Sequence, residues 1–263
     1  MCGIAGYSLK SESSVDRTLL AQALLTGIAE RGADAVGYAH RVPTGPIRVH
    51  KRRSGASALL SELAIPAEAV EVLLHVRDYT KGHPTIAANN HPVRHGAVVG
   101  VHNGIILNDE EIFERQGFDR NEPEMSVDTE AILAVVEAFG PVGKTLEQLC
   151  GSMATAWVDE RRPGAVYLAR GVGRPLWIGE SREGLVFAST VQGLEVSERF
   201  LGLRFKKREL DEGTLLTVEG GRVARRERFR PDRGFTERSL PAVRAPGERE
   251  SCLRLLTALA SLS

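Results

Sequence analysis

The order of the predicted elements indicates an α+β protein of packed sheets with helices on the outside. Strand-like segments open the chain, helical segments occupy its middle, and four strand-like segments follow one another between residues 153 and 190. A doubly wound βαβ array would instead alternate strands and helices regularly. We therefore expect sheets that pack on each other, covered by helices.

The first half of the chain supplies strands and then helices. Residues 2–9 (CGIAGYSL) predict a buried strand, and residues 14–32 an amphipathic helix with Leu20, Leu24 and Ile28 spaced by four and Gly32 at its end. Further strands are expected at 36–42 and 47–53, paired around the turn PTGP (43–46), and at 69–80 and 96–106. Further helices are expected at 108–118, 126–140 and 145–151. Asn108 and Glu111 form a possible capping box at the start of the first. The second has Ser126 or Asp128 near its cap and Gly140 at its end.

The second half returns to strands. They are predicted at 153–160, 165–171, 175–181 and 185–190, followed by a hairpin over 213–229 around Gly220 and Gly221. From about Phe229 the chain becomes rich in Arg and Pro, and it ends in an apolar helical segment at 252–262. We therefore expect a domain over residues 2–228 and a tail over 229–263 whose short helix folds back on that domain or docks on a partner.

Composition describes an ordinary globular protein. The 263 residues include 34 Lys+Arg and 34 Asp+Glu, so no global charge attracts the chain to nucleic acid or a membrane surface. No apolar run approaches the ~18 residues of a membrane span, and no secretory signal is evident. The scattered Cys2, Cys150 and Cys252 do not form a disulfide framework. These features predict a cytoplasmic protein.

Cys2 is a candidate N-terminal nucleophile. An initiator methionine before a small residue is usually trimmed, which leaves Cys2 with both a thiol and a free α-amine. Ordinary pKa values are about 8.5 for the thiol and about 7.7–8.0 for the amine, so transfer of the proton costs on the order of 1 kcal/mol. The amine of Cys2 can therefore act as base for its own thiol, without a separate histidine.

Other residues suit attack on an amide. The Asn103 side-chain amide and the Gly104 backbone N–H can stabilise an oxyanion, although Asn-Gly is also a common turn pair. Arg77, with Thr80 beside it at a strand end, can bind a carboxylate. Asp128 can bind an ammonium group or merely cap a helix. An arginine and an aspartate facing one pocket match the two charges of a free amino acid.

Six motifs appear in a familiar order: MCGIAGY, ERGADAVGYA, HVRDYTKGHP, NNHP, VVGVHNGII and SVDTEAI. Over roughly residues 2–228 the chain resembles the class II glutamine amidotransferases, and most closely the glutaminase domain of glucosamine-6-phosphate synthase. The resemblance implies a four-layer αββα N-terminal-nucleophile (Ntn) hydrolase fold of two mainly antiparallel sheets with flanking helices. It implies no metal and no cofactor.

The resemblance also implies roles for individual residues. Cys2 is the nucleophile that forms a glutamyl thioester, and Asn103 and Gly104 form the oxyanion hole. Arg77 binds the α-carboxylate of glutamine and Asp128 its α-ammonium. Thr80 contributes to the same pocket, His91 lines it, and Arg31 and Gly32 shape its neighbourhood.

Two positions depart from the family pattern. Asp78 stands where the family has a bulky apolar residue, which is tryptophan in the most similar members and helps to gate the ammonia path there. The change therefore argues against channelling of ammonia to an acceptor site. Lys81 stands where those members have a histidine. The residues after 228 are too few for a synthase domain. We therefore expect a stand-alone glutaminase that supplies ammonia to a separate synthase, or else an Ntn amidohydrolase acting on another γ-glutamyl amide. A non-catalytic domain that binds an amino acid is the third alternative.

Two other signals are weaker. His91 and His95 have a spacing that metal ligands can adopt, but no cysteine or carboxylate framework accompanies them. The basic run RVARRERFRPDR (222–233) could contact nucleic acid, but its acidic residues favour a solvated strand edge. We expect Cys150 and Cys252 to be packing residues.

Overall fold

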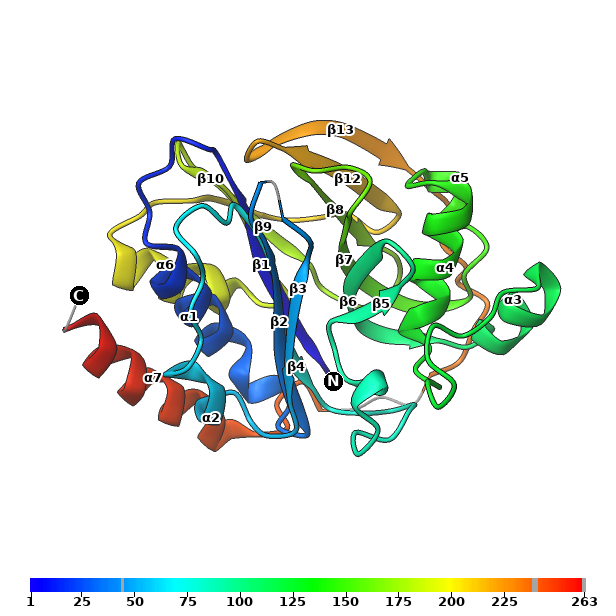
Figure 1. The fold of residues 1–263 in the computed structure, drawn as a ribbon, viewed down its shortest axis with the longest axis horizontal. Helices are drawn as coiled ribbons and strands as arrows, with labels where there is room; N and C mark the ends of the chain where they lie inside the picture. Colours follow the sequence, from blue (N-terminus) through cyan, green and yellow to red (C-terminus); the bar gives the residue numbers. More distant parts are fainter. Residues whose placement is uncertain (44, 238–240, 262–263) are drawn as a thin grey trace.

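The computed structural model describes residues 1–263 except 44, 238–240 and 262–263. Two antiparallel sheets pack face to face and helices cover both outer faces, which confirms the predicted fold class (Figure 1). The predicted turn at 43–46 lies partly outside the described residues. No helix in the described part of the chain is long and apolar enough to cross a membrane.

The first sheet has seven strands in the order β11-β9-β10-β1-β4-β2-β3. Its strands are β1 (Gly3–Leu9), β2 (Ala35–Arg41), β3 (Arg48–Arg52), β4 (Glu71–Arg77), β9 (Trp177–Glu180), β10 (Gly184–Ala188) and β11 (Lys206–Glu209). The second sheet has six strands in the order β13-β12-β8-β7-β6-β5. They are β5 (Val93–His95), β6 (Val98–Ile106), β7 (Gly151–Asp159), β8 (Ala165–Arg170), β12 (Thr214–Glu219) and β13 (Arg222–Arg228).

Helices form the two outer layers. The first sheet carries α1 (Arg17–Ile28), α2 (Ser57–Leu60), α6 (Val191–Leu201) and α7 (Pro246–Ala260), with the 3-10 turn η1 (Ala29–Arg31) after α1. The second sheet carries α3 (Asp109–Gln116), α4 (Thr129–Phe139) and α5 (Gly143–Leu146), and the turn η2 (Ala87–Asn89) precedes β5. The helix predicted at 252–262 corresponds to α7, whose predicted last residue lies outside the described part of the chain. It packs against α1, α2 and η1.

Strand alternation distributes the apolar residues over three buried layers. In β1, Ala5, Tyr7 and Leu9 face the α1 side, whereas Ile4 faces the second sheet. In β6, Val99 and Val101 face the first sheet. Since successive side chains of a strand point to opposite faces, this phase also fixes the direction of every polar residue at the strand ends.

Two local predictions were wrong. Asn108 does not cap α3 with its side chain, which instead donates to Gln148 O (2.9 Å) and accepts from Cys150 N (2.8 Å). The amide of Asn108 thus joins two loops rather than closing a capping box with Glu111. Helix α6 (Val191–Leu201) was not predicted at all.

The first residue of β4 is a buried acid that the site does not use. Glu71 is 3% exposed, lies near Arg41, and has one carboxylate oxygen without a hydrogen-bond partner in the described structure. Burial raises the pKa of Glu71 to about 7, although Arg41 and the N–H of Gly164 oppose the shift.

We expect Glu71→Gln to stabilise the fold at pH 8. The folded state favours the protonated acid, so ionising Glu71 costs stability as the pH rises from its unfolded pKa, about 4.5, through about 7. The gain at pH 8 should be on the order of 1–3 kcal/mol and should nearly vanish at pH 5. Urea unfolding at both pH values measures it, with exposed Glu68→Gln as control. A Glu71→Gln variant less stable than wild type at pH 8 would contradict the assignment.

Candidate active site

Cys2 and Asn103 lie at the same end of the two-sheet sandwich. In the first sheet Gly3 pairs with Val76 and Ile4 with His75, so Cys2 lies beside the end of β4. The ring Nε2 of His75 bonds across the layer to the carbonyl of His102 (3.1 Å), the residue before Asn103. Because Asn103 has the same phase as Val99 and Val101, its side chain faces the first sheet.

The Cys2 thiol lies in a polar, positively charged setting. Its Sγ donates to the carbonyl of Asp78 (3.4 Å), and its own carbonyl accepts from Nε of Arg31 (2.8 Å). Burial raises the pKa of the thiol, and Arg77 acts in the opposite direction. Three arginines, Arg31, Arg77 and Arg174, lie close enough to Cys2 for its charge to act on them. Burial lowers the pKa of each guanidinium group, and the negative charge of a Cys2 thiolate raises it again. Three guanidinium groups therefore favour the anionic sulfur, the form that acts as nucleophile.

Asn103 is fully buried, and neither end of its side-chain amide has a hydrogen-bond partner in the described structure. Leaving such a group unpaired costs ~1–3 kcal/mol, so it requires an explanation. An amide donor held ready beside a nucleophile can stabilise charge on a bound carbonyl oxygen.

Gly104 allows the strand to approach its neighbour closely. Asn103 and Gly104 lie inside β6, opposite Ala154 and Met153 of β7, so the alternative of a simple turn is wrong. The φ of Gly104 is +145°, and a Cβ there would lie 2.0 Å from the carbonyl oxygen of Ser152. Only glycine fits at this position.

Asp128 precedes α4 but does not cap it with its side chain. Its carboxylate is buried and accepts from the backbone N–H of Ile106 (2.6 Å). Burial raises the pKa of Asp128 to about 6, and the Ile106 N–H partly offsets this. The alternative of a side-chain helix cap is therefore wrong, and the carboxylate instead bonds the end of β6.

Arg77 ends β4 and is 1% exposed. One guanidinium nitrogen donates to Oδ1 of Asn90 (2.6 Å), and the other donates to the carbonyls of Lys81 (2.8 Å) and Gly82. Arg77 thus holds the loop that follows it, and Thr80 lies exposed on that loop. The charges of Asp128 and Cys2 both act on Arg77.

His91 is buried and lies behind the site. Its Nε2 is 2.7 Å from Oγ1 of Thr129 in α4, and its ring stacks on His75 with the centroids 4.0 Å apart. Burial holds the pKa of His91 well below its usual value, so the ring is neutral. His95 contacts Glu130 instead (2.9 Å), and among the described residues no group of three or more His, Cys, Asp or Glu side chains could hold a metal.

The glycine after Arg31 explains the geometry around η1. A Cβ on Gly32 would lie 2.4 Å from the backbone of Arg77, so the absence of a side chain lets η1 approach the end of β4. This close approach brings Arg31 to Cys2.

The two positions that depart from the family pattern form ion pairs. The Asp78 carboxylate pairs with the ammonium group of Met1 and with Nε of Arg244 (3.2 Å). Lys81 Nζ lies 2.8 Å from both carboxylate oxygens of Asp109 and 3.0 Å from Glu110. Neither side chain opens an apolar passage next to the nucleophile.

Sequence reasoning missed three of these residues: Asn90, Arg174 and Arg244. Asn90 directly precedes His91 in the NNHP segment. Because His91 was predicted to line the site, the position of Asn90 beside it could have indicated that Asn90 belongs there too. Arg174 lies in a loop fastened to β7, where Met153 N donates to Val172 O (3.1 Å). Nothing in the sequence indicated that Arg244, 166 positions away, contacts Asp78.

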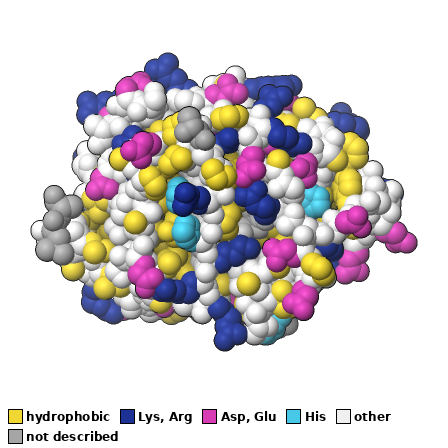
Figure 2. All heavy atoms as spheres, viewed as in Figure 1, with side chains coloured by type: hydrophobic (Ala, Val, Ile, Leu, Met, Phe, Trp, Pro, Cys, Tyr) yellow, Lys and Arg dark blue, Asp and Glu magenta, His cyan; other side chains and the backbone are white. Residues whose placement is uncertain are grey.

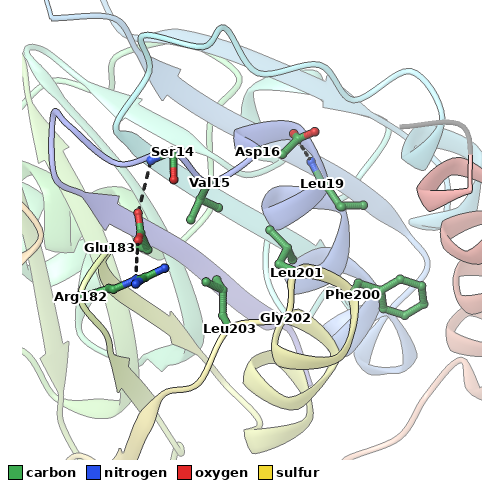
Figure 3. A pocket seen from close by; sticks show the side chains of 10 residues that line it. All are labelled: Ser14, Val15, Asp16, Leu19, Arg182, Glu183, Phe200, Leu201, Gly202 and Leu203. Carbon is green, nitrogen blue, oxygen red and sulfur yellow. Dashed lines mark hydrogen bonds and ion pairs between the residues drawn. The ribbon is translucent and has the colours of Figure 1, made fainter.

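The surface away from this site holds a separate pocket and mixed charges. A pocket of about 360 Å³ lies at the far end of β1, where Ser14, Val15 and Asp16 meet Arg182, Glu183 and the end of α6 (Figure 3). Figure 2 shows acidic and basic side chains interspersed on one face of the molecule. The arginines of β13 pair with acids, Arg225 with Glu227 and Arg226 with Asp211, as expected for a solvated strand edge.

Comparison with known proteins identifies the class. Residues 77–196 match the family described as "Glutamine amidotransferase domain". A glutamine–fructose-6-phosphate aminotransferase [isomerizing] of Vibrio vulnificus (strain YJ016) is 31% identical over 241 residues, which are 85% of this chain and 36% of that protein. The Methanothermobacter thermautotrophicus protein of the same name is 30% identical over 231 residues, 84% of this chain and 37% of that protein.

Solved structures share the fold. The glutamine phosphoribosylpyrophosphate amidotransferase of B. subtilis, complexed with ADP and GMP, aligns with a TM-score of 0.67 at 19% identity, covering 87% of this chain and 49% of that one. A glutamine aminotransferase class-II domain protein from Silicibacter pomeroyi aligns with a TM-score of 0.54 at 16% identity, covering 88% of this chain and 100% of that one.

The sequence matches define the family, and the solved structures share its fold. The chain contains a class II glutamine amidotransferase domain, as the sequence motifs predicted. Within the class it is similar to the glutamine–fructose-6-phosphate aminotransferases, but it spans only 36% of the length of the Vibrio vulnificus protein.

We expect the free energy of unfolding of Asn103→Leu to equal or exceed that of wild type, although the variant lacks the amide that can stabilise a bound carbonyl oxygen. Leucine has the same branched shape but no buried amide to leave unsatisfied, so the unfolding free energy should rise or stay within about 1 kcal/mol of wild type. Thermal unfolding measures this, with the equally buried Asn90→Leu as control, which breaks the bond to Arg77 and should lose stability. A large loss of stability in Asn103→Leu would show that the amide has a structural partner.

Proposed function

We propose that this chain hydrolyses the side-chain amide of L-glutamine to glutamate and ammonia through a thioester on Cys2. The observation that carries the proposal is the buried amide of Asn103, which has no hydrogen-bond partner among the described residues and lies at the end of the sandwich where Cys2 precedes β1. Membership of the amidotransferase class supports glutamine as the substrate.

The reaction follows from the groups around Cys2. After removal of Met1, the α-amine of Cys2 takes the thiol proton, and the sulfur attacks the amide carbon. A C–S bond forms while the carbonyl electron pair moves to oxygen, where Asn103 and the Gly104 N–H stabilise the charge. The Cys2 ammonium returns its proton to the departing nitrogen, so that the C–N bond breaks and ammonia leaves. Water, deprotonated by the same amine, then attacks the thioester carbon. The C–S bond breaks, the sulfur takes the proton back from the Cys2 ammonium, and glutamate leaves.

We assign substrate recognition to Arg77 and Asp128, with Thr80 on the loop beside Arg77 and the buried His91 supporting the site from behind. The buried Asp128 carboxylate receives the α-ammonium of glutamine, and Arg77 receives the α-carboxylate. Both guanidinium ends of Arg77 are engaged, so the substrate carboxylate takes the place of the carbonyl of Lys81 or Gly82. The hydrogen bond between an arginine and a carboxylate is stronger than the bond between an arginine and a neutral carbonyl oxygen.

We further propose that a separate synthase consumes the ammonia. This chain aligns with 36% of the length of the Vibrio vulnificus aminotransferase. Asp78 and its ion pairs occupy the position at which the resemblance expects an apolar gate. Ammonia release should therefore be measurable without an acceptor present.

We expect Met1-free protein to release equal amounts of ammonia and glutamate from glutamine. Cys2→Ala should abolish this while the thermal unfolding temperature stays within a few degrees of wild type. A form that retains Met1 should be inactive, because the base nitrogen is then in a peptide bond. Enzyme-coupled ammonia detection measures all three. Equal rates with and without Met1 would rule out the proposed base.

The same assay separates the alternatives. Faster release from another γ-glutamyl amide than from glutamine would favour the Ntn amidohydrolase. Glutamine binding by calorimetry without turnover would favour a binding domain.

We expect the KM for glutamine to rise at low pH. The pKa of Asp128 is raised to about 6, so its carboxylate binds an ammonium group above pH 6 and loses this ability as the pH falls through that value. The KM should increase about tenfold per pH unit below 6. Asp128→Asn should have a high KM at pH 8 and no such dependence. A flat KM profile in wild type between pH 5 and 8 would contradict the assignment.

A further inference from the structure

The C-terminal tail passes the active site on its way to α7. After β13, Phe229 is buried and donates its N–H to the carbonyl of Gly213 (3.0 Å). Arg233 then pairs with Glu212 (2.6 Å), and Glu237 pairs with Arg174, whose charge acts on Cys2. In Figure 1 the described part of the tail just before α7, in orange, lies near the end of the sheet where the chain begins.

The far end of the tail is firmly attached to the first sheet's helices. The backbone N–H groups of Arg244 and Ala245 both donate to the carbonyl of Glu30 (2.9 and 3.0 Å). Glu248 accepts from the N–H and hydroxyl of Ser57 (2.9 and 3.1 Å), and Cys252 in α7 is fully buried. The backbone position of Arg244 is therefore fixed by its own bond to Glu30 and by the contacts of the residues that follow it.

From this position Arg244 reaches Asp78. Its Nε lies 3.2 Å from Oδ2 of Asp78, the oxygen that also pairs with the Met1 ammonium. The backbone carbonyl of the same Asp78 accepts from the Cys2 thiol (3.4 Å). One residue thus links the tail to both the thiol and the amino end of the chain. When Met1 is removed, its ammonium leaves this mostly buried carboxylate, and Arg244 stays as a cation beside it.

We propose that Arg244 is a positioning residue for Cys2. It acts through Asp78, whose carbonyl orients the thiol and whose carboxylate faces the amino end of the chain. The role rests on the proposed function, since it concerns the same nucleophile. It makes one residue of the C-terminal tail, Arg244, part of the surroundings that position the nucleophile.

The test compares Arg244→Gln with Arg244→Lys and with Arg249→Gln. Arg249 lies on the same tail and pairs with Glu30 (3.3 Å), so its substitution reports general loosening of the tail. Each Met1-free protein is assayed for kcat and KM with glutamine, and for the rate at which iodoacetamide alkylates Cys2, followed by peptide mass spectrometry. Intact mass gives the fraction that has lost Met1.

We expect Arg244→Gln to lower kcat and the Cys2 alkylation rate about tenfold with KM within twofold, because a small misplacement of a reacting group is costly. Arg244→Lys should restore most of both rates, and Arg249→Gln should stay within twofold of wild type. Asp78→Asn should match Arg244→Gln, and the double variant should be no slower than either, since both act through one contact.

Unchanged alkylation in Arg244→Gln, or an equal loss in Arg249→Gln, would overturn the inference. The alkylation rate needs no turnover of glutamine. If wild type releases no ammonia yet the alkylation rates follow the expected pattern, the proposed function fails while the positioning role of Arg244 stands.

Discussion

The apolar layer between the two sheets determines where the reactive groups lie. Ile4 and Leu73 of the first sheet pack in one buried cluster with Val99 and Val101 of the second. Because side chains alternate along a strand, the same phase that buries these residues turns Asn103 toward the first sheet. A shift of one residue in β6 would turn the amide into the α4 layer. The packing of the core and the geometry of the site therefore have a single cause.

The site contains buried polar groups that lower the stability of the fold, and hydrogen-bonded neighbours that stabilise it. Asn103 is buried without a partner, and His75, His91 and His102 are kept neutral by burial. Around them, Arg77 is fastened by the loop it contacts and Asp128 by the N–H of Ile106. Rigid surroundings let a group without a partner keep its direction until a substrate arrives.

Periodicity in the sequence predicted most strands, and short motifs indicated the main groups of the site. Both kinds of evidence are local in the sequence. The chemistry of the residues indicated Cys2 as a nucleophile and the Asn-Gly pair as an oxyanion site, and the resemblance implied the same roles. Helix α6 was missed because its Gly193 weakens the helical signal. The close approach of α1 and α6 depends on Gly27 of α1, where a Cβ would lie 2.3 Å from the Gly193 Cα. The bonds of Arg77 and the contact of Arg244 with Asp78 likewise depend on how distant segments meet, which no local pattern contains.

The most direct test of the account is to trap the covalent intermediate. Met1-free protein mixed with glutamine is quenched in acid within milliseconds, and its peptides are examined by mass spectrometry. The account predicts a glutamyl adduct on the Cys2 peptide that forms and decays at the rate of ammonia release. An adduct on Cys150 or Cys252, or ammonia release without any adduct on Cys2, would contradict it.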